Sequence, residues 1–256
     1  MISGKLRLRF SKTGRAKYIS HLDLMATMRR ALLRAGLNLE YSKGFNPHPY
    51  MSVALPLPVG NGSICELMDV GITIDTLPDG LPGKINEVLP DGLPGKINEV
   101  LPDGLTGKIN EVLPEDLPGL INNLLPEGLK VSEVYIPERK FNSIAWVGIS
   151  GLLCYDAGAP PDAAERLTER FTEESIVISK KTKRGVSEIN ISPFVRDISF
   201  QQLCEVTMSA RISAQNPSIN TENLLSALKG GHESLIPDFY DFTRTEVFDT
   251  EMNVFR

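Results

Sequence analysis

Residues 5–12 read KLRLRFSK, a stretch in which basic and apolar side chains alternate. A period of two is typical of a half-buried strand, because successive side chains point to opposite faces. We expect the apolar side chains to face a core. The opposite face then carries three basic side chains: Lys5, Arg7 and Arg9. Many RNA-binding sheets use such an uncovered face, and a solvated charged face is the alternative.

A helix follows this strand. SHLD at residues 20–23 has the spacing of a capping box, in which Ser20 and Asp23 close the first turn. The amphipathic segment after it runs to Gly36, a residue suited to ending a helix. The stretch therefore predicts a strand and a helix that share one core.

Three further strands complete a first unit. They are expected at residues 51–60, 63–74 and 129–137. A second helix position, residues 77–128, separates the last two strands. The order β-α-β-β-α-β is that of a ferredoxin-like unit, which we assign to residues 1–137.

The second helix position consists of a 12-residue repeat. LPDGLPGKINEV at residues 77–88 recurs at 89–100, with one change at 101–112 and in decayed form at 113–124, before a half copy at 125–129. A proline near the start of each copy and the Leu-Pro-Asp-Gly break predict a row of short helices. The insertion is interpreted either as a spacer or docking arm, or as a surface helix lengthened by duplication of a DNA segment.

The second half of the chain, residues 138–256, predicts the same order with one addition. Its strands and helices are expected at residues 141–155, 160–171, 202–213, 220–230 and 241–248. The addition is a β-hairpin at residues 175–192. The tip of this hairpin carries four basic residues: Lys180, Lys181, Lys183 and Arg184. The expected fold class is therefore α+β, with two tandem ferredoxin-like units.

The composition, 41% hydrophobic and 23% charged, is typical of soluble globular proteins. No apolar run reaches the roughly 18 residues that cross a bilayer, and the first residues are too charged for a signal peptide. A cytoplasmic protein without a membrane partner is therefore expected. The three cysteines are widely spaced, and nucleotide-binding and zinc-protease motifs are absent, so no cofactor and no metal site are expected.

Positive charge is concentrated in the first part of the chain. Residues 1–60 contain ten Lys and Arg against two acidic residues, whereas residues 61–130 contain four against twelve. Such an asymmetry indicates a candidate anion-binding face in a protein that is acidic overall.

The basic segment before the first helix suits a phosphate. Lys12, Arg15 and Lys17 crowd the turn that leads into the helix. The free N–H groups and the positive end of the helix dipole favour an anion at the same place. His21, the first helical residue, is a candidate phosphate ligand or base, with a surface residue of no special role as the alternative.

YSKGFNPHPYMS at residues 41–52 predicts a stiff loop. Each proline restricts its own φ and pushes the residue before it into an extended conformation. We expect Phe45, His48 and Tyr50 to stack on unpaired bases while Lys43 meets the backbone, as in single-strand binding. The alternative is that this aromatic loop closes one end of the core.

Three longer stretches resemble one bacterial family: KTGRAKYISHLDLM at residues 12–25, YSKGFNPHPYMSVALPLPVG at 41–60 and PERKFNSIAW at 137–146. The family is a domain of unknown function that is fused to, or encoded beside, B12-binding radical-SAM proteins. The resemblance implies an RNA or ribosome context and a radical-SAM partner acting in trans, and it supplies no catalytic residues. The tandem layout is also similar in outline to CRISPR-repeat endoribonucleases.

These observations predict an RNA-binding accessory protein that acts with a radical-SAM enzyme in RNA modification or ribosome-related processing, with no DNA partner. One alternative is a metal-independent endoribonuclease in which His21 or His48 is the base and Lys17 or Lys43 stabilises the transition state. The other alternative is a non-catalytic protein-interaction scaffold that docks its partner through the repeats.

Overall fold

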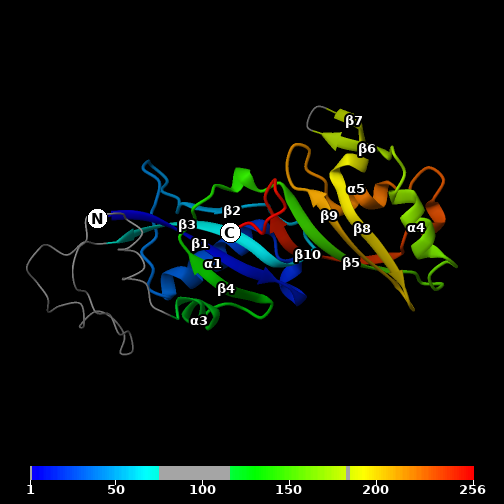
Figure 1. The fold of residues 1–256 in the computed structure, drawn as a ribbon. Helices are drawn as coiled ribbons and strands as arrows, with labels where there is room; N and C mark the ends of the chain where they lie inside the picture. Colours follow the sequence, from blue (N-terminus) through cyan, green and yellow to red (C-terminus); the bar gives the residue numbers. More distant parts are fainter. Residues whose placement is uncertain (1, 75–115, 183–184) are drawn as a thin grey trace, which may run out of the picture. The chain divides into compact units, whose positions relative to one another are not determined.

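The computed structural model describes residues 2–74, 116–182 and 185–256 (Figure 1). The fold is mixed α+β, with a large mixed β-sheet. The chain divides into two compact units: unit 1 contains Met1–Pro56 and Glu66–Glu138, and unit 2 contains Leu57–Cys65 and Arg139–Arg256. None of the helices within the described ranges is long and apolar enough to cross a membrane.

Unit 1 follows the order strand, helix, strand, strand, helix, strand. Its elements are β1 (Ile2–Lys12), the 3-10 helix η1 (Gly14–Tyr18), α1 (His21–Arg34), β2 (Met51–Val53), β3 (Gly62–Ile74), α3 (Leu117–Asn122) and β4 (Leu129–Tyr135). The strands lie in the order β4-β1-β3-β2. β1 pairs antiparallel with β4, and β2 pairs antiparallel with β3. The order of elements agrees with the predicted order.

The apolar side chains of β1 form the centre of the core of unit 1. Leu6, Leu8 and Phe10 are fully buried, as the alternation predicts. They belong to one cluster with Met28 and Leu32 of α1. The period of two in the sequence therefore assigns the core face of this strand correctly.

Helix α1 begins where the capping pattern predicts. Ser20 Oγ accepts a hydrogen bond from the Asp23 N–H at 3.1 Å and lies 2.7 Å from Asp23 Oδ2. A side-chain acceptor at this position satisfies one of the free N–H groups of the first turn. The helix ends at Arg34, two residues before Gly36, whose φ of 87° lies in the left-handed region that favours glycine.

The decayed fourth copy of the repeat contains α3. Asp116 caps this helix by accepting a hydrogen bond from the Gly119 N–H at 3.1 Å, and Pro118 lies in the first turn. Leu117 and Ile121 are buried in the core of unit 1. This copy forms the short helix that the sequence predicts. The three copies at residues 77–112 lie outside the described residues.

Unit 2 contains a four-stranded sheet and a separate hairpin. Its elements are η3 (Phe141–Ser143), β5 (Trp146–Cys154), α4 (Ala163–Phe171), β6 (Val177–Thr182), β7 (Gly185–Asn190), η4 (Ser192–Phe194), β8 (Val195–Gln202), β9 (Val206–Ser213), α5 (Thr221–Ser226), η5 (Glu233–Leu235) and β10 (Phe239–Phe248). The strand order β10-β5-β9-β8 is antiparallel throughout. Gly62 and Ser63, at the start of β3, belong to unit 2 and pair in parallel with Thr243 and Arg244 of β10. β6 pairs with β7 as the predicted hairpin.

The sequence does not predict β8. Its register against β9 shifts between Arg196 and Ser199, and Asp197 between them has a φ of 48°. An irregularity of this kind adds a residue to one strand and interrupts the alternation of side chains. The period of two is therefore lost in VRDISFQQ, and the strand is recognised only from its pairing.

The sheet of unit 2 has one covered face and one open face. Helix α4 packs on the covered face, where the rings of Phe171 and Phe200 lie 5.7 Å apart. On the other face, Ser199 pairs with Ser209 and their hydroxyl oxygens are 2.9 Å apart. We call this second surface the open face of unit 2. Four exposed polar side chains define it: Ser199, Gln201, Thr207 and Ser209.

A buried ion pair joins β1 to β3 in unit 1. Arg7 is fully buried and donates from Nε to Asp69 Oδ1 at 2.7 Å and from Nη2 to Oδ2 at 3.1 Å. Two parallel bonds between a guanidinium and a carboxylate are among the strongest polar contacts in proteins. The Asp69 charge thereby offsets the cost of placing Arg7 in the interior.

Replacing Asp69 by Asn should lower the free energy of unfolding by about 3–5 kcal/mol, because it removes the charge that compensates a buried guanidinium. Urea denaturation followed by circular dichroism measures this loss. Asp197→Asn is the matched control, since its pair with Arg211 is exposed and is worth about 1 kcal/mol or less. Equal losses in the two variants would contradict a structural role for the buried pair.

Candidate nucleic-acid interface

The loop at residues 41–50 is closed by hydrogen bonds between its two arms. The Ser42 N–H donates to the His48 carbonyl at 2.8 Å, and the His48 N–H donates to Ser42 Oγ at 3.0 Å. Tyr41 and Pro49 form a bridge just outside this pair. The loop is therefore a small hairpin with a defined conformation.

Strand β3 anchors the base of this loop. The Glu40 N–H donates to the Gly71 carbonyl at 2.9 Å, and the Gly71 N–H donates to the Tyr50 carbonyl at 2.7 Å. A Cβ atom at Gly71 would lie 3.0 Å from the Tyr50 Cβ and 3.1 Å from Glu40 Oε2. Only glycine lets the two arms approach β3 this closely without displacing a neighbour.

The aromatic side chains of the loop face solvent. Phe45 is 100% exposed, and Tyr41 and Tyr50 are exposed as well. Lys43 and His48, on either side of Phe45, are also exposed. The alternative prediction, in which this loop closes one end of the core, is therefore wrong. The rings are accessible, and their stacking on unpaired bases stays a prediction.

Lys5 and Tyr50 share the sheet face that Asp69 occupies. Ser52 is paired with Asp69, so Tyr50, two residues earlier, points to the same side. From the opposite flank of β3, Lys5 Nζ lies 3.8 Å from Asp69 Oδ2, and its side chain remains largely exposed. Adjacent strands are about 4.8 Å apart, which places the β1 and β2 backbones about 10 Å apart.

Arg7 and Arg9 do not face solvent, contrary to the expectation from the sequence. Arg7 is bound to Asp69, and Arg9 is buried with its Nε 4.0 Å from Glu133 on β4. Burial raises the pKa of the neighbouring Tyr135 phenol, and the positive charge of Arg7 opposes that rise. The alternation assigns these side chains to the correct face. On that face Arg7 and Arg9 are nevertheless buried and paired with carboxylates of neighbouring strands, whereas Lys5 stays exposed.

Lys12 is buried as well, which the sequence does not predict. Its ammonium donates to the Lys17 carbonyl at 3.2 Å and to the Ile19 carbonyl at 3.3 Å. Burial lowers the pKa of Lys12, and the negative charge of Glu66 opposes the shift. Lys12 therefore holds the turn after β1 in place and does not reach a phosphate in solvent.

The start of α1 keeps part of the predicted basic cluster. Arg15 and Tyr18 are exposed, and Lys17 Nζ lies 5.4 Å from the centre of the Tyr18 ring. His21 is exposed at the first helical position. Asp23 adds a carboxylate to the same turn, and its negative charge opposes the binding of a second anion there.

The helix start and the loop lie at opposite ends of α1. The helix has 14 residues, and at 1.5 Å per residue it is about 20 Å long. Arg15 and His21 belong to its first end, whereas Phe45 and His48 follow its last turn. The structure therefore does not bring the two candidate catalytic histidines together. Of the two candidate regions, the loop is the one that lies at the same end of the sheet as Lys5.

The predicted basic hairpin, β6 and β7, belongs to unit 2. The Lys180 ammonium donates to the Ser218 carbonyl, so it is engaged within the unit. The side chains of Lys181, Lys183 and Arg184 lie outside the described residues.

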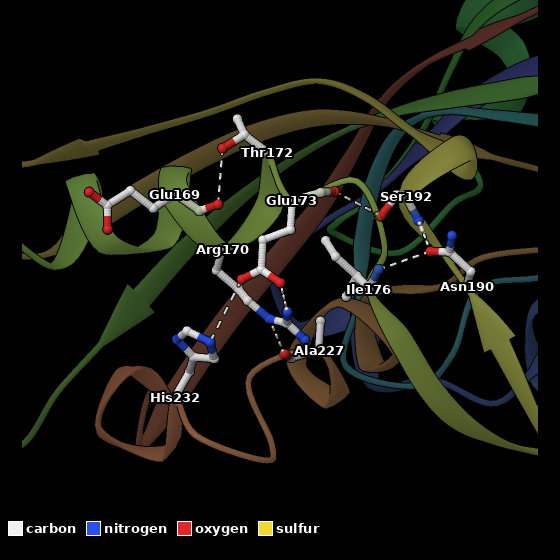
Figure 2. A network of polar contacts seen from close by, with 9 residues as sticks. All are labelled: Glu169, Arg170, Thr172, Glu173, Ile176, Asn190, Ser192, Ala227 and His232. Atoms are coloured by element: carbon white, nitrogen blue, oxygen red, sulfur yellow. Dashed lines mark hydrogen bonds and ion pairs between the residues drawn. The ribbon is translucent and has the colours of Figure 1, made fainter.

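The base of this hairpin is held by side-chain hydrogen bonds (Figure 2). Asn190 Oδ1 accepts from the Ile176 N–H at 2.9 Å and from the Ser192 N–H at 3.1 Å. Ser192 Oγ donates to the Glu173 carbonyl at 3.1 Å. Asn190 thus ties the two ends of the hairpin to each other, and Ser192 ties them to Glu173 after α4.

The same network continues to the segment after α5. Arg170 Nη1 lies 2.5 Å from Glu173 Oε2, and Arg170 Nε donates to the Ala227 carbonyl at 2.9 Å. The ring of His232 approaches the other Glu173 oxygen, with Nε2 at 3.9 Å (Figure 2). These contacts connect α4, the hairpin and the segment after α5.

Sequence reasoning missed two arginine–aromatic contacts in unit 2. The Cζ of Arg196 lies 4.2 Å from the centre of the Trp146 ring, and that of Arg211 lies 5.0 Å from the centre of the Phe248 ring. The signal was the alternation of small polar and apolar residues at 206–213, which predicts a strand with one polar face. Nothing in that pattern indicates which aromatic rings the arginines meet.

No group of three or more His, Cys, Asp and Glu side chains within the described ranges is arranged to hold a metal ion. The three cysteines are free thiols, of which Cys65 is buried, Cys154 half-buried and Cys204 exposed.

Residues 5–111 match the model of a protein family described as "Uncharacterized protein conserved in bacteria (DUF2344)". This segment includes the loop at residues 41–50. No curated protein matches the chain. Among solved structures, the chain is similar to one described as "Crystal Structure of an Unknown Protein from Galdieria sulphuraria", with 9% identity, a TM-score of 0.24, and coverage of 95% of this chain and 99% of that chain.

Replacing Asn190 by Ala should speed hydrogen exchange at the Ile176 amide by about tenfold. The variant removes an acceptor shared by two backbone N–H groups, and one such bond contributes about 1 kcal/mol. Amide exchange followed by NMR measures the change. Asn38→Ala, at an exposed asparagine of unit 1, is the control. Unchanged exchange at Ile176 would show that Asn190 does not hold the hairpin.

Proposed function

We propose that this protein binds single-stranded RNA and that the loop at residues 41–50 is its contact surface. The proposal is carried by one observation: Phe45 is completely exposed on a loop whose two arms are hydrogen-bonded. Removing a phenylalanine side chain from water contributes roughly 1.5–3 kcal/mol, and folding does not bury the ring of Phe45. A partner that covers the ring gains this free energy on binding.

The groups around Phe45 favour an RNA partner. Stacking of bases on aromatic rings tolerates any sequence, and a preformed loop loses little entropy on binding. Lys43 supplies a charge for the backbone, and the exposed His48 and Tyr50 supply hydrogen-bonding groups for base edges and the ribose 2′-hydroxyl.

The cations near this loop are few. Lys5 and Lys43 have exposed side chains at this end of the sheet, whereas Arg7 and Arg9 are buried. Each phosphate neutralised on a single strand contributes about −0.7 to the slope of log affinity against log salt. The expected slope is therefore about −1 to −2, and stacking supplies most of the affinity.

The proposal extends to the architecture: both units are ferredoxin-like. The order of elements in unit 1 and the strand orders β4-β1-β3-β2 and β10-β5-β9-β8 support this assignment. In unit 2, the hairpin β6–β7 is then an insertion between α4 and the second strand of the unit.

The proposed role is that of an accessory to a radical-SAM enzyme acting in trans. It is supported by the resemblance of residues 12–25, 41–60 and 137–146 to the radical-SAM-associated family. Endoribonuclease activity remains a prediction. Since His21 and His48 lie at opposite ends of α1, each would have to act without the other.

Replacing Phe45 by Ala should weaken binding of a fluorescein-labelled single-stranded RNA by about tenfold or more, because stacking of one base is worth about 1–3 kcal/mol. Fluorescence anisotropy measures the dissociation constants. Phe45→Trp keeps a ring at this position and should retain binding.

Leu33→Ala is the matched control, because it removes an exposed apolar side chain from α1. It should leave the dissociation constant unchanged. Equal affinity of the Phe45→Ala and unaltered proteins would exclude the loop as the contact. RNA fragments that form in EDTA and disappear in His48→Ala would favour the endoribonuclease over the accessory protein.

A further inference from the structure

The open face of unit 2 carries Arg196 and Trp146 together. Arg196 pairs with Arg211 across β8 and β9, and Arg211 pairs with Gly148 across β9 and β5. Directly opposed residues of antiparallel strands share a face, and Trp146 lies two residues from Gly148 on the same side. Ser209, two residues before Arg211, is also on this side. Arg196 therefore lies on the same face as the exposed hydroxyl side chains, which we call the hydroxyl row: Ser199, Thr207 and Ser209.

Arg196 covers the Trp146 ring and remains exposed itself. Its Cζ lies 4.2 Å from the ring centre, and Trp146 is buried whereas Arg196 is an exposed residue. Among the described residues, no carboxylate is within ion-pair distance of Arg196. The guanidinium thus offers an outer planar surface and N–H groups at its edge.

Arg211 differs from Arg196 in its charge balance. It lies over Phe248 with Cζ 5.0 Å from the ring centre, and its Nη1 is 2.5 Å from Asp197 Oδ2. The carboxylate neutralises this second guanidinium. Of the two guanidinium groups, that of Arg196 is therefore the one without a carboxylate partner in the described part of the chain, and its plane is suited to stacking on another planar group.

The rest of the open face supplies hydrogen-bonding groups at the edge of that plane. Ser199, Gln201, Thr207 and Ser209 are exposed, and each carries both a donor and an acceptor. Unpaired bases bind proteins through stacking on aromatic or guanidinium planes together with hydrogen bonds to their edges. Both elements are present here on one sheet surface.

We infer that unit 2 carries its own site for an unpaired nucleobase, formed by Arg196 stacked on Trp146 and bordered by the hydroxyl row of the open face. A base packs on the outer side of the Arg196 guanidinium and hydrogen-bonds to Ser199 or Ser209. This site uses neither the loop at residues 41–50 nor any residue of unit 1, so it goes beyond the proposed function.

Trp146 is the single tryptophan of the chain, so its fluorescence reports on this site alone. Titration of the full-length protein with a short unstructured single-stranded RNA should change its emission in a saturable way. A duplex of the same sequence should not, because its bases are already stacked and paired. Arg196→Ala should weaken the fluorescence-detected binding by about tenfold.

Arg196→Lys separates stacking from charge. It keeps the positive charge and loses the planar guanidinium, so it should weaken binding about as much as Arg196→Ala does. Arg166→Ala is the matched control: it removes an equal charge from α4, where Arg166 donates to Ser234 Oγ at 2.9 Å. It should leave the titration unchanged.

The two sites are distinguished by the Phe45→Ala variant, which should retain the Trp146 response. Constant emission at RNA concentrations that saturate the anisotropy signal would overturn the unit 2 site and leave the loop proposal intact. If Trp146 emission changes with RNA but Phe45→Ala leaves the affinity unchanged, the loop proposal is overturned and the unit 2 site is kept. Full retention of the response in Arg196→Ala, or in Arg196→Lys, would also overturn the inference, because the guanidinium plane would then be dispensable.

Discussion

The buried pair between Arg7 and Asp69 is the interaction on which unit 1 depends. A guanidinium in the interior requires a carboxylate held at hydrogen-bonding distance, so β1 and β3 must keep one register for the bidentate contact to form. The same register places the apolar side chains of β1 against α1. One charge pair thus couples the position of the central strand to the packing of the core.

This pairing also limits which basic side chains of unit 1 are available for the proposed RNA contact. Arg7 and Arg9 resemble an exposed basic row in the sequence, yet their charges are used inside the protein. The loop at residues 41–50, which β3 anchors through Gly71, is accessible, as are Lys5, Arg15 and His21. A stiff loop on a rigid sheet presents Phe45 without a large loss of entropy on binding, which is how loops positioned by a scaffold commonly act.

Arg196 and Arg211 of unit 2 lie over aromatic rings at its surface, whereas Arg7 of unit 1 is buried in an ion pair. The sheet of unit 2 exposes hydroxyl side chains and arginines stacked on aromatic rings, and the basic hairpin is held at its base by Asn190. Base stacking in both proposed sites would need few phosphate contacts, which agrees with a chain whose net charge is −5. Radical-SAM association remains a prediction from sequence resemblance.

Local patterns determined the elements whose causes are local. Alternation assigned the core face of β1, Ser20 and Asp23 set the start of α1, and the prolines of residues 41–52 indicated a stiff loop. Only the tertiary structure decided that Arg7 and Lys12 are buried, that β8 is a strand, and that Arg196 covers Trp146. Each of these depends on a partner elsewhere in the chain, such as Asp69, 62 positions from Arg7. A pattern of period two states which residues share a face of a strand, but the burial of that face depends on what the rest of the chain places against it.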